Sequence, residues 1–242
     1  MRPFAIGGDF NWRYALGEIF LIVVGVTIAL AASSWYEGRK DRIDEQLFIS
    51  RLHEDIQLAE ELTSRVRDRR LGLLKSLIDA SDVIYGRAGR KILNDIECNA
   101  IGDSSNFNIN ISDLPSLAEL VSTGRMAIIQ DGDLRIALVA LQQIKGTLPL
   151  LIDQLESNTS DLTRSYPGLI QNEAYIESDT GEVRTRSRCD SDKIRANQTW
   201  VNHFAVNIDQ YDVYIRDGLK PWLQQIDKIH QIVDESMGIQ HD

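Results

Sequence analysis

The sequence predicts a mostly α-helical protein, in which one N-terminal transmembrane helix continues into an antiparallel helical bundle with a small hairpin or loop region. Three observations predict this fold. An uncharged apolar run lies near the N-terminus, apolar residues recur at helical spacing through most of the remaining chain, and the stretches without that spacing are short. Helices with one apolar stripe bury it by packing against one another, so a bundle is the expected arrangement.

The uncharged run covers residues 19–32, IFLIVVGVTIALAA. Aromatic residues stand on both sides of it, as they do where membrane helices meet the two lipid–water interfaces. At about 1.5 Å per residue, the stretch from Tyr14 to Trp35 is roughly 30 Å long, which matches the hydrocarbon core of a bilayer. We therefore expect residues 1–11 to be an N-terminal tail and residues 12–36 to be the anchor, with interfacial residues Trp12, Tyr14, Trp35 and Tyr36.

An apolar run near the N-terminus is also compatible with a cleaved signal peptide or a buried core helix. Ala29-Leu-Ala31 has the small residues of a signal-peptide cleavage site. The region before the apolar run is long and weakly basic, however, which favours an uncut anchor. A buried core helix can be equally apolar, but it rarely carries aromatic pairs at both ends.

The charges that flank the anchor are nearly balanced, with Arg2 and Arg13 before it and Arg39, Lys40 and Arg42 after it. This count slightly favours a cytoplasmic C-terminal side, but long domains are translocated largely regardless of such charges. Because an uncut anchor usually leaves a short N-terminal tail in the cytoplasm, we expect a bacterial inner-membrane protein with a periplasmic C-terminal domain.

Two features of the anchor suggest contacts within the membrane. Glu18 is an acid within the anchor, directly before the uncharged run, where it is either functional or, as we favour, held at the lipid headgroups near Arg13. Small residues also share one helix face, which lets another transmembrane helix approach closely. They are Gly17, Gly25, Ala29 and Ser33.

Residues 37–242 are expected to form one helical domain. In chain order we expect a helix at about 37–85, a loop at about 86–112, helices at about 113–123 and 132–165, a loop or hairpin at about 166–190, and a helix at about 191–236. Glycines, prolines and short polar residues mark the element ends. These are Gly86 and Gly89, Asp113 with Pro115, Asp131 or Asp133, Pro149 as a kink or a new start, and a turn at Asp179-Thr-Gly181.

The two cysteines, Cys98 and Cys189, both stand in polar, loop-like surroundings. They are candidates for one disulfide that would connect the two irregular regions, or they are two free thiols. The disulfide requires an oxidising compartment. A metal site built from these cysteines is not expected, because zinc takes four ligands and no C-x-x-C spacing is present.

The four histidines show no motif that specifies a metal site. His53-Glu54 lacks the second histidine of a zinc-peptidase helix. His230 has Asp227 and Asp234 at helical spacing, which is a weak candidate for a ligand trio, but surface ion pairing is the favoured interpretation.

Other chemistry is also not indicated. The sequence has no glycine-rich phosphate loop and no G-x-S-x-G, and Asp131-Gly-Asp133 lacks the later ligands of a calcium loop. We therefore expect no catalytic residues, no cofactor, no metal and no enzyme activity. The net charge of −10 argues against nucleic acid, and the basic runs Arg65–Arg70 and Arg184–Arg188 are interpreted as a solvated helix face and a basic loop.

Two parts of the sequence carry recognisable motifs. The first is Gly17-Glu18-Ile19, then Gly25-Val-Thr-Ile-Ala-Leu30, then Trp35-Tyr-Glu37-Gly-Arg39-Lys40. The second is Ser122-Thr-Gly124, followed by Asp131-x-Asp-Leu-Arg135. In both parts the chain resembles an uncharacterised family of bacterial single-pass membrane proteins of unknown function. Trp35-Tyr departs from the Asn-Trp-Asn of that family. The resemblance implies the same architecture and no particular chemistry.

The function expected from this architecture is that of a non-catalytic accessory or structural subunit, with the lipid bilayer and the transmembrane helices of a larger complex as partners. One alternative is a periplasmic ligand-binding or sensing module, which would have to signal through a separate protein because we expect no downstream signalling domain after Asp242. Another is a membrane-tethered homo-oligomeric scaffold, whose anchor would associate with copies of itself.

Overall fold

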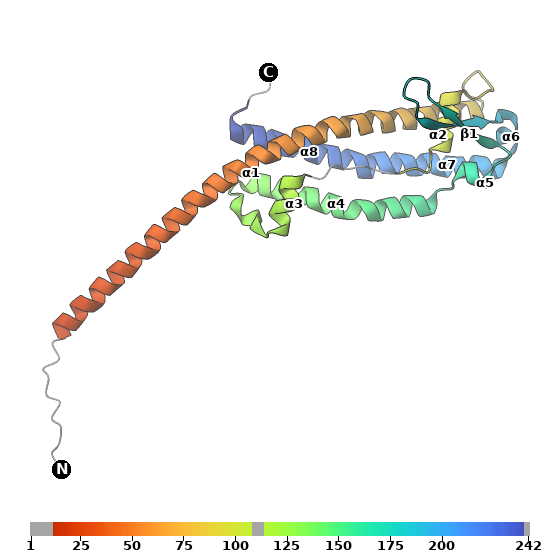
Figure 1. Cartoon of the computed structure of the whole chain (residues 1–242). Helices are drawn as coiled ribbons and strands as arrows, with labels where there is room; N and C mark the ends of the chain where they lie inside the picture. The colour runs from red at the N-terminus through yellow and green to blue at the C-terminus, as the bar shows by residue number, and fades with distance from the viewer. Residues whose placement is uncertain (1–11, 108–113, 240–242) are drawn as a thin grey trace, which may run out of the picture. The chain divides into compact units, whose positions relative to one another are not determined.

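The computed structural model describes residues 12–107 and 114–239, without the side chains of residues 13–15. The protein is mostly helical with a small two-stranded sheet, as predicted (Figure 1). The chain divides into two compact units, Met1–Ser50 and Arg51–Asp242, which are described separately.

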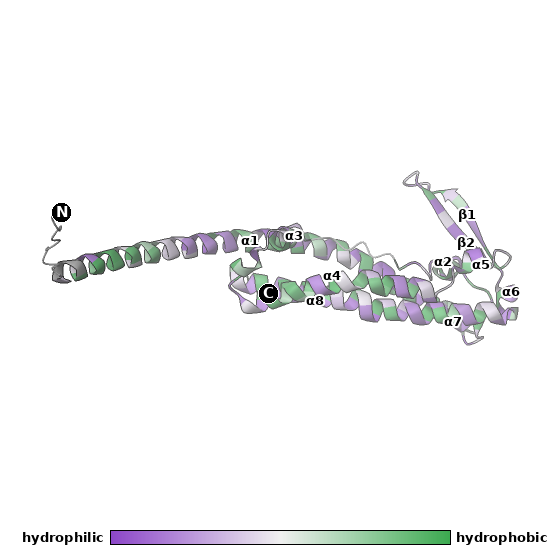
Figure 2. Ribbon diagram, turned by 90° about the horizontal axis from the view of Figure 1, so that it is seen from below, coloured by the Kyte–Doolittle hydropathy of each residue, from purple (hydrophilic) through white to green (hydrophobic). Residues whose placement is uncertain are grey.

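The first unit contains the N-terminal part of helix α1, which spans Trp12–Ile84. The apolar run of residues 19–32 lies within this part of the helix, where Figure 2 shows a green stretch. Its large side chains are exposed, with Leu21 at 71% and Ile28 at 63% of their full accessible surface. The unit is therefore a helix with apolar residues on its outside.

The second unit is built on long helical segments (Figure 1). Helix α1 from Arg51 onward and α4 (Gly132–Asn158) lie beside a third segment, in which α7 (Gln198–Val213) and α8 (Lys220–Met237) follow each other end to end. Helix α4 contacts both α7 and α8. A one-turn π-helical segment, η2 (Tyr214–Leu219), joins α7 to α8.

Apolar stripes hold these helices together. On α1, Leu52, Ile56 and Ala59 recur at steps of four and three and are buried. Farther along the chain, Leu77 and Ala80 join a cluster with the aromatic residues of α7, including Trp200 and Phe204. Except for Trp200, these residues belong to the apolar stripes that the helical spacing predicts, and burying such residues is the main favourable contribution to folding.

Shorter elements lie between the long helices. They are α2 (Asp95–Gly102), α3 (Pro115–Ser122), the 3-10 turn η1 (Arg125–Ile128), α5 (Leu162–Ser165) and α6 (Ser191–Ala196). Strands β1 (Ile170–Ile176) and β2 (Val183–Cys189) pair antiparallel, with Ile170 opposite Cys189. Gly181 turns the chain between the strands with a φ of 71°, in the left-handed region that favours glycine.

Helix α2 corrects the prediction of a loop at 86–112. Asn94 accepts a hydrogen bond from the backbone N–H of Glu97, and the Glu97 carboxylate accepts one from the N–H of Asn94. This reciprocal pair, a capping box, starts a helix in a polar sequence that lacks an apolar stripe. Cys98 therefore lies on a helix and is buried, rather than in a loop.

The predicted helices at 132–165 and 191–236 are also interrupted. The first ends at Asn158, and Asp161 then caps the separate short helix α5. The second breaks at Asn197, whose side chain caps α7 by accepting a hydrogen bond from the N–H of Trp200. In both cases a short polar side chain binds the backbone locally and restarts the helix.

The structure also locates the other residues that were predicted to begin or kink a helix, and the basic run predicted as a loop. Asp131 is the residue that caps α4, Pro149 lies inside that helix, and Asp113 lies outside the described residues. The basic run predicted as a loop lies on β2, where Arg186 and Arg188 both contact the Glu173 carboxylate on β1.

Candidate functional site

The apolar part of α1 is the first candidate functional feature. Among the described residues, two helices are long and apolar enough to cross a membrane, and they are α1 and α4. Helix α4 buries part of its apolar surface in the domain through Leu134, Leu138 and Leu141, and 22% of its apolar window is buried. The apolar window of α1 is not buried at all within the chain.

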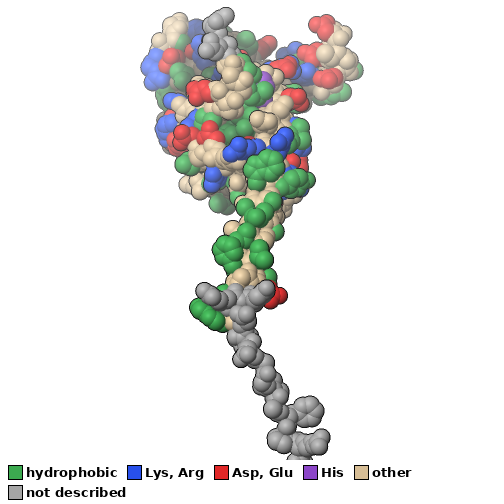
Figure 3. All heavy atoms as spheres, turned by 90° about the vertical axis from the view of Figure 1, so that its left-hand side faces the viewer, with side chains coloured by type: hydrophobic (Ala, Val, Ile, Leu, Met, Phe, Trp, Pro, Cys, Tyr) green, Lys and Arg blue, Asp and Glu red, His purple; other side chains and the backbone are tan. Residues whose placement is uncertain are grey.

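The predicted anchor residues lie along this stretch. Trp12, Trp35 and Tyr36 are each about two-thirds exposed, at 65%, 68% and 66%. The Tyr14 side chain is outside the described residues. Glu18, Ala29 and Ser33 are exposed. Figure 3 shows the apolar side chains of the helix on its surface.

The second candidate is a cluster of ionisable side chains between α1 and α8, and we call it the His–carboxylate cluster. It consists of His53 and Glu60 from α1, and His230 and Asp234 from α8. Residues four apart on a helix share a face, which places His230 and Asp234 together. His53 and Glu60 are about two turns apart on one face of α1, so both can face α8.

The two histidine rings converge on one carboxylate. Nε2 of His53 lies 3.0 Å from Oδ1 of Asp234, and Nε2 of His230 lies 3.3 Å from Oδ2 of the same residue. On its other side, Nδ1 of His230 lies 2.7 Å from Oε1 of Glu60. The ring centroids of the histidines are 5.4 Å apart.

The cluster is shielded from solvent to different degrees. The side chain of Asp234 is 4% exposed, those of His53 and His230 are 13% and 16% exposed, and that of Glu60 is 33% exposed. Buried ionisable groups are costly unless they are paired. Here the pairing partners come from two helices, so the cluster links α1 to α8.

The geometry constrains the state of His230, because both of its ring nitrogens face carboxylate oxygens. A neutral imidazole has one N–H donor and one lone pair, so it can satisfy only one of the two oxygens. A cation in the space in front of the other nitrogen would be bound by that nitrogen and by the facing carboxylate oxygen together.

The sequence indicates a weak candidate for a ligand trio of His230, Asp227 and Asp234, without His53 or Glu60. In the structure Asp227 is exposed and is not part of the His–carboxylate cluster. The four-residue spacing of His230 and Asp234 is the only feature of the sequence that indicates this cluster. The positions of His53 and Glu60 beside them depend on how α1 and α8 are aligned.

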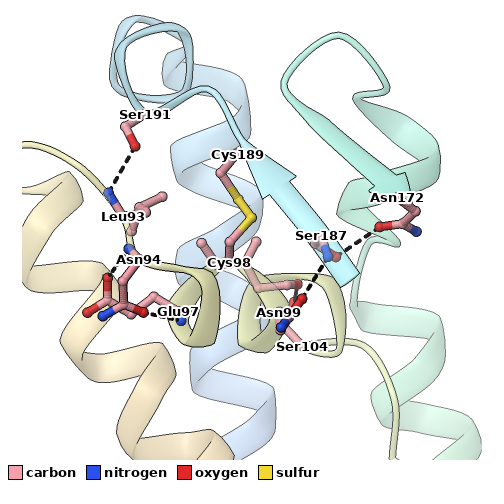
Figure 4. The surroundings of a disulfide bond; sticks show 11 residues. Leu93, Asn94, Glu97, Cys98, Asn99, Ser104, Asn172, Ser187, Cys189 and Ser191 are labelled. Atoms are coloured by element: carbon pink, nitrogen blue, oxygen red, sulfur yellow. Dashed lines mark hydrogen bonds between the residues drawn. A yellow bond between two sulfur atoms is a disulfide. The ribbon is translucent and has the colours of Figure 1, made fainter. Parts of the chain in front are cut away.

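The third candidate is the end of the domain where α2 meets the hairpin. Cys98 of α2 and Cys189 at the end of β2 form a disulfide across a separation of 91 residues (Figure 4). Hydrogen bonds surround it. The N–H of Ser187 donates to Asn99 over 2.7 Å, and the N–H of Leu93 donates to the Ser191 hydroxyl over 3.0 Å. The disulfide is thus part of a tied junction between α2, β2 and α6.

Glu97, next to this disulfide, is a buried carboxylate with strong partners. Arg90 donates to it from both terminal guanidinium nitrogens. Burial raises the pKa of Glu97, but the hydrogen bonds from Arg90 and from the backbone of Asn94 outweigh it, so the pKa lies below its usual value. The role of this carboxylate is to cap α2 and hold the preceding segment.

No protein-family model matches this chain, and neither a curated protein nor a solved structure matches it. Functional inference therefore rests on the residues and their geometry.

Proposed function

We propose that this chain is a non-catalytic accessory subunit of a membrane protein complex, anchored in a bacterial inner membrane by the N-terminal part of α1. The observation that carries the proposal is the stretch from Tyr14 to Trp35, which contains the uncharged run of residues 19–32 and is long enough to cross a bilayer. The apolar window of this helix is unburied within the chain. Apolar surface of this extent is unfavourable in water, and lipid removes it from water.

The position of the aromatic residues supports the same role. Trp12 precedes the run, Trp35 and Tyr36 follow it, and all three side chains are exposed. Such rings are favoured at lipid headgroups because they combine an apolar body with a polar edge. The anchor would thus be fixed in depth at both interfaces.

The disulfide supports a periplasmic location for the helical domain. Disulfides form and persist in oxidising compartments, of which the bacterial periplasm is one, and are rare in the cytosol. The Cys98–Cys189 bond is therefore expected only if the domain has crossed the membrane. In this domain we take the long helices to form an antiparallel bundle, which would present its outer faces to a partner.

The small residues of the anchor support a lateral partner within the membrane. A Cβ atom added to Gly17 or Gly25 would meet nothing within 4 Å among the described residues outside the helix itself. Packing inside the chain therefore does not explain these glycines. Small residues allow helix backbones to approach closely in lipid, where van der Waals contact drives association.

The test is to extract the protein gently from native membranes and to identify its companions by native gel electrophoresis and mass spectrometry. The proposal predicts stoichiometric co-migration with a larger assembly. Gly25→Leu should release the chain from it, whereas Val23→Leu, on the opposite side of the helix, should not. Migration of the wild-type chain alone or as a homo-oligomer would contradict the proposal, and a homo-oligomer would favour a self-associating scaffold.

A second candidate is a periplasmic ligand-binding or sensing module. The specific observation in its favour is the His–carboxylate cluster, since shielded ionisable groups that converge on one point are a common feature of binding sites. Migration of the chain without other proteins, together with a specific ligand at this cluster, would favour this function.

A further inference from the structure

We propose that His53, His230 and Asp234 bind one divalent transition-metal ion of the zinc class, and that Glu60 is a positioning residue that orients His230. The inference concerns the helical domain alone, and it does not depend on the partner proposed above. It rests on the donor atoms, their separations, their charges and their shielding.

The donor atoms are close enough to share one ion. The three residues each offer one ligand atom, and these atoms all lie within 4.8 Å of one another. Tetrahedral Zn²⁺ with bonds of about 2.1 Å separates its ligand atoms by roughly 3.4 Å. Nε2 of His53 lies 3.0 Å from Oδ1 of Asp234, and Nε2 of His230 lies 3.3 Å from Oδ2 of the same carboxylate. Each imidazole is thus already near that separation from one oxygen of Asp234, and the carboxylate lies between the two rings.

The position of Glu60 fits the same site. A histidine that binds a metal usually donates its other ring N–H to a carboxylate or carbonyl, which fixes the tautomer and the ring orientation. Nδ1 of His230 has such a partner in Glu60 at 2.7 Å. Its Nε2 lone pair then points toward the Asp234 side, where the ion would lie.

Charge balance also favours a divalent ion. With both histidines neutral, the site contains the two negative charges of Asp234 and Glu60, and one divalent cation neutralises them. The donor set of two imidazole nitrogens and one carboxylate suits zinc, copper, iron or nickel. Calcium and magnesium are disfavoured because they prefer more oxygen ligands. Three protein ligands leave a fourth tetrahedral position, which water can occupy.

Binding at this place would connect two helices that are distant in sequence. His53 is on α1, and the other two ligands are on α8. The ion would thus hold the beginning of the domain against its last helix, in addition to the apolar contacts between them. The consequence is a domain whose helix packing depends on metal supply.

The experiment uses the full-length chain in detergent, purified without a histidine tag and stripped with a chelator. Co²⁺ is titrated in, and visible absorption is recorded, because Co²⁺ bound by few nitrogen and oxygen ligands absorbs more strongly than the hydrated ion. Zn²⁺ is then added to displace it. The variants are His53→Gln and His230→Gln, with His203→Gln as control, since His203 contacts Tyr166 instead of the cluster.

We expect one equivalent of Co²⁺ to bind wild-type protein and His203→Gln, Zn²⁺ to displace it, and both cluster variants to lose this binding. The helical circular dichroism of each variant shows whether it folds. Absence of saturable binding to the wild-type chain overturns the proposal without reference to any variant. Binding that is undiminished in His53→Gln and His230→Gln also overturns it, because the ion then lies elsewhere.

Discussion

Nδ1 of His230 lies 2.7 Å from Oε1 of Glu60, 170 positions earlier in the chain. This contact joins the last long helix to the first. Because Nε2 of His230 also faces a carboxylate, that of Asp234, the ring is held in one orientation between two acids. A metal ion in front of Nε2 would be shared by this ring and the Asp234 carboxylate.

Replacing Glu60 by Gln should weaken Zn²⁺ binding about 10- to 100-fold, the usual effect of removing an outer carboxylate behind a metal-bound histidine. Competition with a chromogenic chelator measures the affinity. Glu61→Gln is the matched control, because the neighbouring Glu61 pairs with Arg65 on the exposed side of the helix. Equal affinities of Glu60→Gln and wild type would show that Glu60 has no positioning role.

Removal of the disulfide by Cys98→Ser with Cys189→Ser should lower the free energy of unfolding by about 2–4 kcal/mol, because the bond closes a long loop. Chemical denaturation of the full chain in detergent, followed by circular dichroism, measures the change. A reductant should destabilise wild-type protein to a similar extent and leave the double variant unchanged. Equal stability of oxidised and reduced wild type would contradict this account of the α2–hairpin junction.

Glu97 should make stability depend on pH in the acid range. Burial raises its pKa, but hydrogen bonds from Arg90 and Asn94 lower it further, so the folded-state pKa lies below the value of 4.5 for a free side chain. The stabilisation is therefore complete above about pH 4.5 and is lost as pH falls through the folded-state pKa.

Glu97→Gln should accordingly be less stable at neutral pH, by about 1–3 kcal/mol, and should lose less stability than wild type on acidification. Unfolding curves at a series of pH values measure both effects. Asp95→Asn is the control, because Asp95 is exposed in the same helical turn. The same acid slope in Glu97→Gln and wild type would assign the pH dependence to other carboxyl groups.

Asn207 is a fully buried amide on α7 that satisfies the backbone where α4 gives way to α5. Its Oδ1 accepts from the N–H of Ser160, and its Nδ2 donates to the Ser160 carbonyl and to the Ser104 hydroxyl. Asn207→Ala should destabilise the domain by about 1–3 kcal/mol, because it leaves buried polar groups unpaired. Asn202→Ala, on the exposed side of the helix, should change thermal stability much less. Similar melting temperatures of Asn207→Ala and wild type would rule out this role.

The long helices could be predicted from the sequence because their apolar residues recur at helical spacing. Leu52, Ile56 and Ala59 on α1 are buried as that stripe requires. Helix α2 could not be predicted in this way, because its start depends on reciprocal hydrogen bonds between Asn94 and Glu97 rather than on an apolar stripe. The break at Asn197 has a similar local cause.

The His–carboxylate cluster shows a different limit of sequence reasoning. The spacing of His230 and Asp234 could be seen in the sequence, and the interpretation as a surface ion pair underestimated their burial, since the Asp234 side chain is 4% exposed. Their proximity to His53 depends on the register between α1 and α8. That register is set by the packing of many apolar residues, and no local pattern specifies it.

We propose that the N-terminal part of α1 crosses a membrane and that the helical domain lies on its outer side. Protease treatment of right-side-out bacterial membranes, after an alkaline carbonate wash, tests it most directly. We predict that the chain stays with the washed membranes and that protease removes the helical domain, leaving a short fragment around residues 19–32 in the lipid. Release of the whole chain by the wash would contradict the anchor, and full protection from protease would contradict the orientation.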